Sequence, residues 1–406
     1  MLSEALSPNV VPIEEPACRF VRQDSVGSNE HPYSGLPFPG FWVFLSGKEM
    51  LGRKRLIKPS NLQYLFGPLA WLALGIAGVI WSLQAASLWL AVPAYIVSMM
   101  LIVGGARYMV ATTIHMMAHH LMFKKASTNL FWGEVLSTIF LIQSLTRYRS
   151  DHLKHHGKIF STLKDGDAVM VLRLGFVPGK TPRQLWWHLI KLCLSPRFHF
   201  LFFKGRLKEN LVLVANYRKA MTVAWLGVLC AIGYFAGLPI LFHTYILPIC
   251  LLIQIPALVQ LLCEHVYINT NLSSRERHIL LSNGRYCGVP LPKRSGNPLR
   301  DGARMAGWAA RMLLVELPFR IIVLQGSMPE HDWHHRHPGS QDWADGRMLR
   351  EKELHAQIAK TGETDFLETW GSIEIIDRVL RNMSRARPYP YDELVLSGAL
   401  EYGDIK

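Results

Sequence analysis

The chain has 406 residues, of which 50% are hydrophobic and 18% charged, and its net charge is +14 at pH 7. Its six cysteines form no CxxC pair, which excludes zinc-ribbon and iron–sulfur sites of that spacing. No nucleic-acid-binding motif accompanies the positive charge, so no nucleic-acid partner is expected. Residues 1–35 lack the apolar run of a signal peptide, and residues 1–60 are expected to form a polar N-terminal tail followed by an interfacial segment at 37–44.

Two long segments without a charged residue come next, at residues 61–106 and 220–263. A membrane-spanning helix needs about 20 apolar residues, so each segment is long enough for two spans and a tight turn. The turns are expected near residues 84–87 and 237–239. The predicted spans are 65–83, 88–108, 221–238 and 244–263.

Lysine and arginine avoid both predicted turns and cluster before, between and after the two hairpins. Because positive charge is retained on the cytoplasmic side during insertion, both termini and the middle segment are expected to be cytoplasmic. Apolar segments at 131–145 and 308–324 are expected to lie along the membrane surface. The predicted fold is an all-α integral membrane protein with four transmembrane helices in two hairpins and a cytoplasmic helical cap. It divides into residues 1–60, a membrane domain with its cap at 61–345, and a cytoplasmic C-terminal tail at 346–406.

Histidines gather in three short motifs and one isolated position, all on the predicted cytoplasmic side. Two of the motifs repeat the spacing i, i+3 and i+4, which is one face of a helical turn. Imidazole is the commonest protein ligand for a transition metal, so imidazoles that converge predict a metal site. The nine candidate ligands are His115, one of His119 and His120, His152, His155, His156, His265, His331, His334 and His335.

Nine imidazoles exceed what one metal ion can use, but they suit two ions with four or five ligands each. Nitrogen-rich, open coordination favours iron, whereas zinc usually takes four ligands, or three in a catalytic site. No Glu-x-x-His pair of the kind found in carboxylate-bridged helix bundles occurs at a useful position. Two alternatives stay open: zinc in a membrane hydrolase, and a non-catalytic metal transporter or sensor. A transporter, however, places ionisable ligands near the middle of the bilayer.

His119 and His120 compete for one place in this ligand set. In a regular helix His119, at i+4, is turned about 40° from His115, whereas His120, at i+5, is turned about 140°. Helical geometry therefore favours His119, unless the helix widens locally, as helices do at some functional sites.

The three motifs resemble the histidine boxes of the membrane fatty acid desaturase superfamily. His115-x-x-x-His119-His120 and His152-x-x-His155-His156 lie between the hairpins, and His331-x-x-His334-His335 follows the second hairpin, over a region of residues 60–345. The resemblance implies a membrane-embedded, non-haem di-iron enzyme. Such an enzyme uses O2 and two electrons to attack an unactivated C–H bond of an acyl chain. It also implies that His265 is the isolated ligand that follows the last span.

Some residues depart from close relatives within that superfamily. Leu261 stands where animal-type stearoyl desaturases have an asparagine, while Asn269 follows His265 by four residues. The stretch that begins at Glu264 is similar to one in alkane hydroxylases, so Glu264 and Asn269 are further candidates at the site. Desaturation, hydroxylation and oxidative decarboxylation therefore all remain open.

The electrons must come from an external donor, and the basic cytoplasmic face suits an acidic one such as a ferredoxin or cytochrome b5. Acidic side chains commonly orient histidines that bind a metal. Four acids adjoin the box histidines and are candidates for that role: Asp151, Glu264, Glu330 and Asp332.

Overall fold

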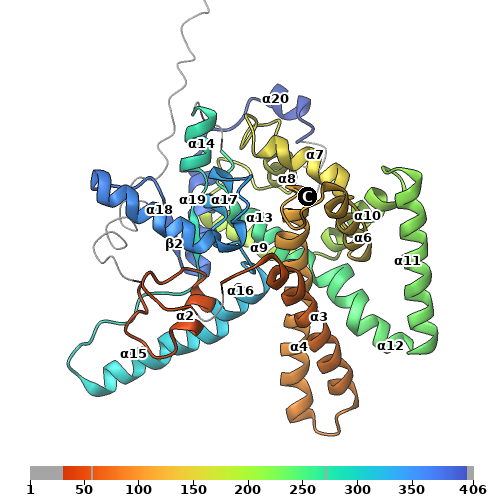
Figure 1. The fold of residues 1–406 in the computed structure, drawn as a ribbon, viewed down its shortest axis with the longest axis horizontal. Coiled ribbons are helices and arrows are strands. Elements are labelled where there is room, and N and C mark those ends of the chain that lie inside the picture. The colour runs from red at the N-terminus through yellow and green to blue at the C-terminus, as the bar shows by residue number, and fades with distance from the viewer. Residues whose placement is uncertain (1–30, 56–57, 269, 271, 400–406) are drawn as a thin grey trace, which may run out of the picture.

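The computed structural model describes residues 31–55, 58–268, 270 and 272–399. Regular structure in this part of the chain is helical apart from one pair of short strands (Figure 1). Three helices within it are long and apolar enough to cross a membrane: Asn61–Gln84, Leu88–Ala118 and Leu238–Glu264. The protein is therefore a mostly helical chain with three candidate membrane-spanning helices.

The first hairpin consists of α3 (Asn61–Gln84) and α4 (Leu88–Tyr108), which Figure 1 shows side by side. The turn falls where the uncharged run predicts it. The helices approach closely because small residues lie between them. A Cβ added at Gly75 would lie 2.7 Å from the Ile102 Cγ1 atom, and one at Gly105 would lie 3.0 Å from the Pro68 carbonyl oxygen.

α4 continues without a break into a π-helical segment, η1 (Met109–Ile114), and then into α5 (His115–Ala118). The first histidine box thus stands at the end of the second long apolar helix. π-Helical turns are rare and occur mostly at functional sites. This one widens the helix just before the first box, not between its histidines.

The second hairpin is formed by α11 (Asn216–Phe235), α12 (Leu238–Leu241), the π-helical η2 (Phe242–Leu252) and α13 (Gln254–Glu264). Gly237, with φ of 96°, makes the turn in a conformation that favours glycine. α11 is not among the three long apolar helices. Its first turn holds Arg218, fully buried, which contacts the Glu134 carboxylate at 2.9 Å. The span expected at 221–238 stays a prediction.

Most of the other helices gather around the ends of the two hairpins that lie away from the hairpin turns (Figure 1). They are α2 (Pro39–Ser46), α6 (Ala126–Ile139), α7 (Leu145–His155), α8 (Gly166–Arg173), α9 (Pro182–Leu194), α10 (Pro196–Leu211), α14 (Ser274–Leu280), α15 (Pro298–Arg311), η3 (Met312–Glu316), α16 (Leu317–Ile322), α17 (His331–Arg336), η4 (Trp343–Asp345), α18 (Gly346–Thr361), α19 (Ser372–Arg385) and α20 (Tyr391–Leu396). The strands β1 (Gly284–Tyr286) and β2 (Glu368–Trp370) pair in parallel, with Arg285 opposite Thr369.

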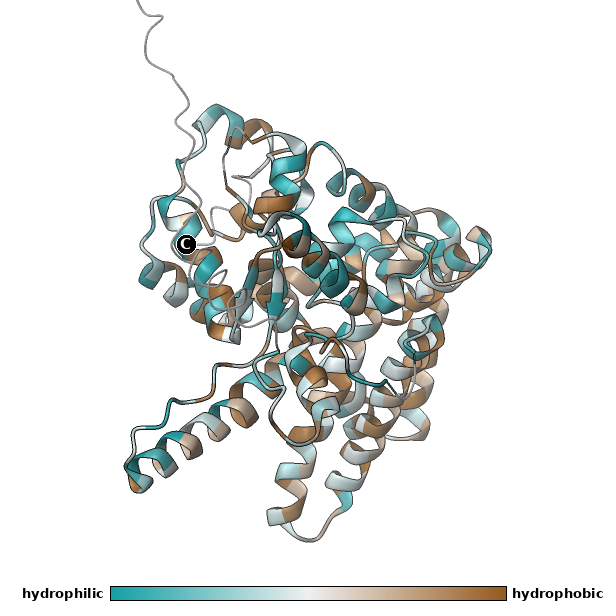
Figure 2. Ribbon diagram, turned by 60° about the vertical axis from the view of Figure 1, so that its left-hand side comes forward, coloured by the Kyte–Doolittle hydropathy of each residue, from teal (hydrophilic) through white to brown (hydrophobic). Residues whose placement is uncertain are grey.

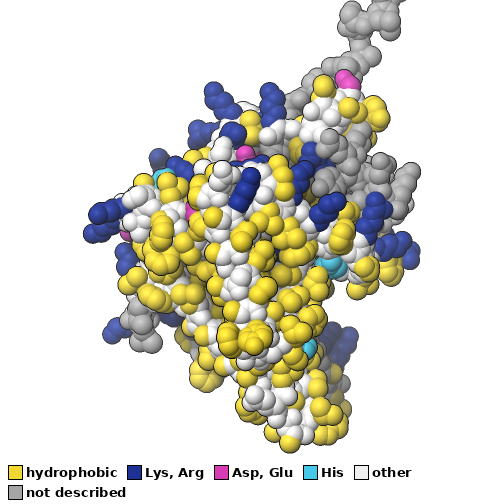
Figure 3. Space-filling view, turned by 90° about the vertical axis from the view of Figure 1, so that its right-hand side faces the viewer, with side chains coloured by type: hydrophobic (Ala, Val, Ile, Leu, Met, Phe, Trp, Pro, Cys, Tyr) yellow, Lys and Arg dark blue, Asp and Glu magenta, His cyan; other side chains and the backbone are white. Residues whose placement is uncertain are grey.

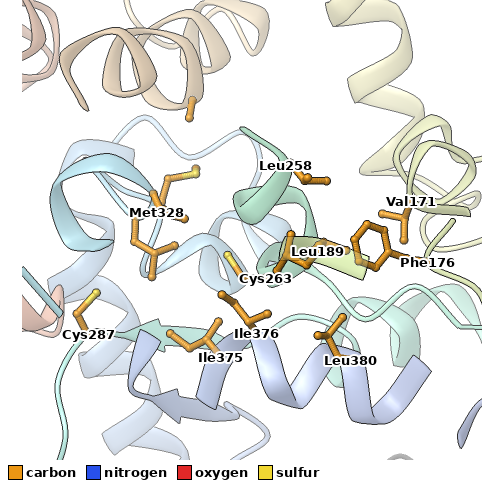
Figure 4. Close-up of a cluster of buried hydrophobic side chains, with 14 of the residues drawn as sticks. Val171, Phe176, Leu189, Leu258, Cys263, Cys287, Met328, Ile375, Ile376 and Leu380 are labelled. Carbon is orange, nitrogen blue, oxygen red and sulfur yellow. The ribbon is translucent and has the colours of Figure 1, made fainter. Parts of the chain in front are cut away.

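Residues 346–399, which the sequence suggested only as a C-terminal tail, form helices and a strand that pack on the rest of the protein. α19 buries one face, including Ile375, Ile376 and Leu380, against α13 and its neighbours (Figure 4). β2 pairs with β1, which lies earlier in the chain. This segment is therefore part of the folded body that surrounds the histidines.

Candidate metal centre

Four separate parts of the chain bring the nine candidate histidines together. The first box lies at α5, with His119 at the C-terminal cap of that helix. The second box lies on the last turn of α7, and the third makes up most of α17. His265 directly follows α13. All nine side chains fall within groups whose nitrogen or oxygen atoms could hold a metal ion.

The first cluster contains five imidazoles whose Nε2 atoms face one another, namely those of His115, His119, His152, His156 and His334. The His152 Nε2 atom lies 2.9 Å from that of His119 and 3.0 Å from that of His156. The His334 Nε2 atom lies 2.9 Å from that of His115 and 3.2 Å from that of His119. All five ligand atoms lie within 4.8 Å of one another.

Hydrogen bonding cannot by itself account for this arrangement. A neutral imidazole with its hydrogen on Nε2 donates one hydrogen bond from that atom, and one without it can only accept there. Five Nε2–Nε2 contacts join the ring atoms, and no placement of hydrogens makes more than three of them hydrogen bonds. A metal ion, in contrast, takes a lone pair from every ring, so this donor set fits a transition metal.

The second cluster contains His155, His265 and His335, extended by His331 and Glu264. The His331 Nε2 atom lies 3.2 Å from the His335 Nε2 atom and 2.8 Å from a Glu264 carboxylate oxygen. The His265 Nε2 atom is buried and has no hydrogen-bond partner among the described residues. An unpartnered buried nitrogen costs free energy unless something binds it, so this cluster also fits a metal ion.

Each of the second and third boxes divides between the two clusters. His152 and His156 join the first cluster while His155 joins the second; His334 joins the first while His331 and His335 join the second. The spacing suggested three rings directed at one object, but adjacent helical residues differ by about 100° in direction. Residues i and i+4 therefore go together, and the residue between them faces the other cluster. The two clusters are in contact where the His156 and His335 rings stack, with ring centroids 4.2 Å apart.

Two residues that sequence spacing could not identify anchor ligands of the second cluster. Asp165, at the N-cap of α8, contacts the His155 Nδ1 atom at 2.9 Å. The Ser282 hydroxyl contacts the His265 Nδ1 atom at 3.0 Å. Both contacts leave Nε2 as the ligand atom, which is the usual effect of such partners. Neither residue adjoins a box, and no local pattern would have revealed it.

Of the four acids that adjoin the boxes, only Glu264 contacts a clustered histidine. Asp332 turns away and forms an ion pair with Arg350 at 2.8 Å. Glu330 faces Arg347 at 3.5 Å, and Asp151 accepts a hydrogen bond from Gln143 at the surface. A position beside a box histidine therefore did not predict contact with that histidine, because neighbouring side chains in the chain point in different directions.

Burial keeps the imidazoles of the first cluster in the protonation state that suits metal binding. Burial lowers the pKa of His119 to about 3, and the charges of His331 and Arg149 act in the same direction. Burial, followed by neighbouring imidazoles, holds the pKa of His156 and of His334 well below the usual value. His155 differs: burial disfavours its cation, but Asp165 and Asp167 outweigh that and raise the pKa to about 9. Neutral imidazole is the form that binds metals.

The structure places His119 and His120 differently. His119 faces His152 and His334, as described above, whereas His120 belongs to none of the groups that could hold a metal ion among the described residues. α5 ends at Ala118, and His120 has a left-handed backbone conformation with φ of 60°. Asn269, the other further candidate, lies outside the described residues.

Comparison with known proteins agrees with this geometry. A family model for fatty acid desaturases matches residues 87–292, just over half of the chain. The comparison with curated proteins found no match. The matched region includes the first two boxes and His265. The chain therefore belongs to the fatty acid desaturase family.

Proposed function

We propose that this member of the fatty acid desaturase family is a membrane-bound di-iron enzyme that introduces a double bond into a lipid acyl chain, using O2 and two electrons. The observation that carries the proposal is the pair of adjoining histidine clusters, one of five imidazoles and one of four with a carboxylate. Nitrogen-rich sites with open positions favour iron over zinc, which is usually held by four ligands in closed sites.

The first cluster would hold one iron through its five Nε2 atoms, and the second would hold the other through His155, His265, His331 and His335. When bound, the two irons would supply the oxidising power to remove hydrogen from an unactivated methylene. The protein's part is to position the imidazoles and to keep water away. Seven of the nine side chains that would bind iron are buried, with His331 and His335 only 2% and 4% exposed, and the other two, His119 and His156, are partly buried.

The proposed topology has four membrane spans, with both termini and the metal centre on the cytoplasmic side. On the face in Figure 3, hydrophobic side chains cover most of the lower part, and most visible Lys and Arg side chains lie above them. The histidine clusters lie at the ends of the Leu88–Ala118 and Leu238–Glu264 helices, where the basic segments begin. Positive charge beside the ends of apolar helices supports a cytoplasmic location for that side.

Two helices, the apolar α2 and the amphipathic α15, support the same orientation. Phe38, at the N-cap of α2, and Phe41 and Phe44 within it are exposed, and Phe44 contacts Trp71 of the first apolar helix at 6.4 Å between ring centroids. Such side chains beside a membrane-spanning helix would enter the boundary between headgroups and acyl chains.

α15 projects from the body with polar and apolar residues on different sides (Figure 2). The Trp308 ring packs on the Trp42 ring of α2, with centroids 5.7 Å apart. Leu299 of α15, and Leu313 and Leu314 of η3, which follows α15, are exposed on another side. We propose that this exposed side lies in the membrane surface, as the apolar pattern of 308–324 suggested, and that the arginines of α15 reach the headgroups.

An external donor would supply the electrons. The basic cytoplasmic side would attract an acidic ferredoxin or cytochrome b5 by electrostatic steering, which raises association rates at low salt. We therefore expect turnover with either soluble donor to fall as ionic strength rises.

Lipid and hydrocarbon profiling of cells that produce the protein tests the proposed reaction. We expect new unsaturated acyl chains, detected by mass spectrometry, which disappear under anaerobic conditions. Hydroxylated chains or terminal alkenes would instead show that the same centre hydroxylates or decarboxylates its substrate.

Alanine variants of His155, His265 and His334 test the centre itself. Each should lose turnover while still inserting into the membrane, because insertion depends on the apolar helices. His355→Ala, which changes a histidine of α18 outside both clusters, is the control and should keep full activity. Full activity in all three cluster variants would contradict the di-iron centre.

A further inference from the structure

His278 lies outside the three boxes, and the structure places it against the second cluster. It is carried by α14, which packs against α17. Its ring lies almost parallel to the Phe160 ring, with centroids 4.4 Å apart and an interplanar angle of 9°. Phe160 is fully buried, so the stack holds the His278 ring in a defined plane.

The two nitrogen atoms of His278 have different partners. Its Nε2 atom lies 3.2 Å from the Gly157 carbonyl oxygen, and its Nδ1 atom lies 3.3 Å from the His335 Nδ1 atom. A carbonyl oxygen can only accept a hydrogen bond, so the His278 hydrogen belongs on Nε2. In the neutral ring Nδ1 then carries a lone pair, and it can accept a hydrogen bond from His335.

This chain of contacts determines the tautomer of His335. Since His278 Nδ1 accepts, His335 carries its hydrogen on Nδ1 and presents an unprotonated Nε2 atom. That Nε2 atom faces the second cluster, 3.2 Å from His331 Nε2. Metal ligation by histidine requires such a lone pair, and a hydrogen bond at the other nitrogen orients the ring and raises its basicity.

His278 adds a third partner of the same kind to the second cluster. Asp165 contacts His155 and Ser282 contacts His265, each at Nδ1, and His278 occupies the equivalent place at His335. In the first cluster, by contrast, the Nδ1 atoms of His156 and His334 have no hydrogen-bond partner among the described residues.

We propose that His278 is a positioning residue of the second metal site, which holds His335 in the tautomer and orientation that bind the ion. The proposal rests on the di-iron centre proposed above. Loss of a hydrogen-bond partner of this kind typically lowers metal affinity 10–100-fold. The effect should be confined to one of the two ions, because His278 contacts no ligand of the first cluster in the described structure.

The test measures iron retained per chain when the purified protein is challenged anaerobically with increasing concentrations of a ferrous chelator. Wild-type protein should retain two irons. His278→Phe keeps an aromatic ring to stack on Phe160 but removes the acceptor, so one iron should be lost at a chelator concentration about 10–100-fold lower. Mössbauer spectra of protein enriched in 57Fe should show that one of two iron signals is affected.

Two further comparisons separate this role from a structural one. His278→Asn places an oxygen acceptor near the lost Nδ1 atom, whereas His278→Leu has almost the same shape without an acceptor. His278→Asn should therefore retain the second iron better than His278→Leu, and this comparison also tests the proposal if His278→Phe does not fold. His188→Phe, a histidine that contacts the Leu174 carbonyl away from both clusters, should behave as wild type.

The outcomes distinguish this proposal from the one on which it rests. Wild-type protein that binds fewer than two irons would contradict the di-iron centre itself. If wild-type protein binds two irons, and His278→Phe and His278→Leu retain both as tightly, only the role of His278 is overturned.

Discussion

The imidazoles of the two candidate metal sites are held in different ways. Asp165 and Ser282 hold His155 and His265 through Nδ1, so Nε2 is left to face the second cluster. In the first cluster the rings face one another directly through Nε2, and the helices α5, α7 and α17 position them. We infer that the second site depends more on hydrogen-bonded partners and the first more on helix packing.

His119 and His120 provide a test at the scale of single residues. His119→Ala should lose the iron of the first cluster, because the His119 Nε2 atom lies 2.9 Å from His152 Nε2 and 3.2 Å from His334 Nε2. His120→Ala is the matched control, since the adjacent side chain lies in neither cluster, and it should keep two irons. Metal analysis of the two purified variants decides between them. Retention of both irons in His119→Ala, with a loss in His120→Ala, would reverse the assignment.

α17 is the element that most needs support from outside itself. It has six residues, and so short a helix is not stable alone in water. Arg350 of α18, fully buried, contacts both Asp332 carboxylate oxygens, at 2.9 and 2.8 Å. The same guanidinium reaches Glu368 of β2 at 2.9 Å, and Lys48 approaches that carboxylate at 2.5 Å. α17 is thus tied to the N-terminal segment and to the C-terminal strand.

The ionised state of this network follows from its charges. Burial alone would raise the pKa of Glu368, but Lys48 and Arg350 together hold it below the usual value. Breaking a buried ion pair by removing one partner typically costs about 3–5 kcal/mol, because the other charge stays buried without compensation.

Arg350→Met tests this network at the scale of elements. The substitution leaves Asp332 without its ion-pair partner, so the unfolding midpoint in detergent should fall and iron content should drop with it. Arg381→Met is the control, since Arg381 is exposed and contacts only Asp377 on its own helix among the described contacts. An unchanged midpoint and two irons in Arg350→Met would show that α17 is held by packing alone.

At the scale of the whole molecule, the metal centre lies where the two helical hairpins meet the surrounding helices. The Leu88–Ala118 helix carries the first box at its end, and the Leu238–Glu264 helix ends one residue before His265. Under the proposed function, an acyl substrate dissolved in the membrane would approach this centre from one side and a soluble electron donor from the other. This arrangement requires that all histidine boxes lie on one side of the membrane.

Reporter fusions test that requirement. Alkaline phosphatase, which is active only outside the cytoplasm, should be active when fused after Ala86 or Gly237 and inactive after Lys406. Green fluorescent protein at the same three positions should give the opposite pattern. The fusion after Gly237 is the most informative of the three, because α11 is not among the three helices that are long and apolar enough to cross a membrane. An inactive phosphatase there would mean that α11 does not cross the membrane.

The sequence by itself determined the features that neighbouring residues encode. The turn before Leu88 was predicted within a residue or two because a break in an apolar run is a local property. The histidine spacing within each box was equally visible, since a helical turn brings i and i+4 together whatever surrounds it. Family membership followed from the same local patterns.

The tertiary structure alone decided which histidines share a cluster and what holds them. His334 meets His115 across 219 positions of sequence, and Lys48 meets Glu368 across 320, so no local pattern relates them. Asp165, Ser282 and His278 reach their ligands from α8, from the segment before β1 and from α14. Such contacts depend on how helices pack, and packing is settled only when the whole chain has buried its apolar surface.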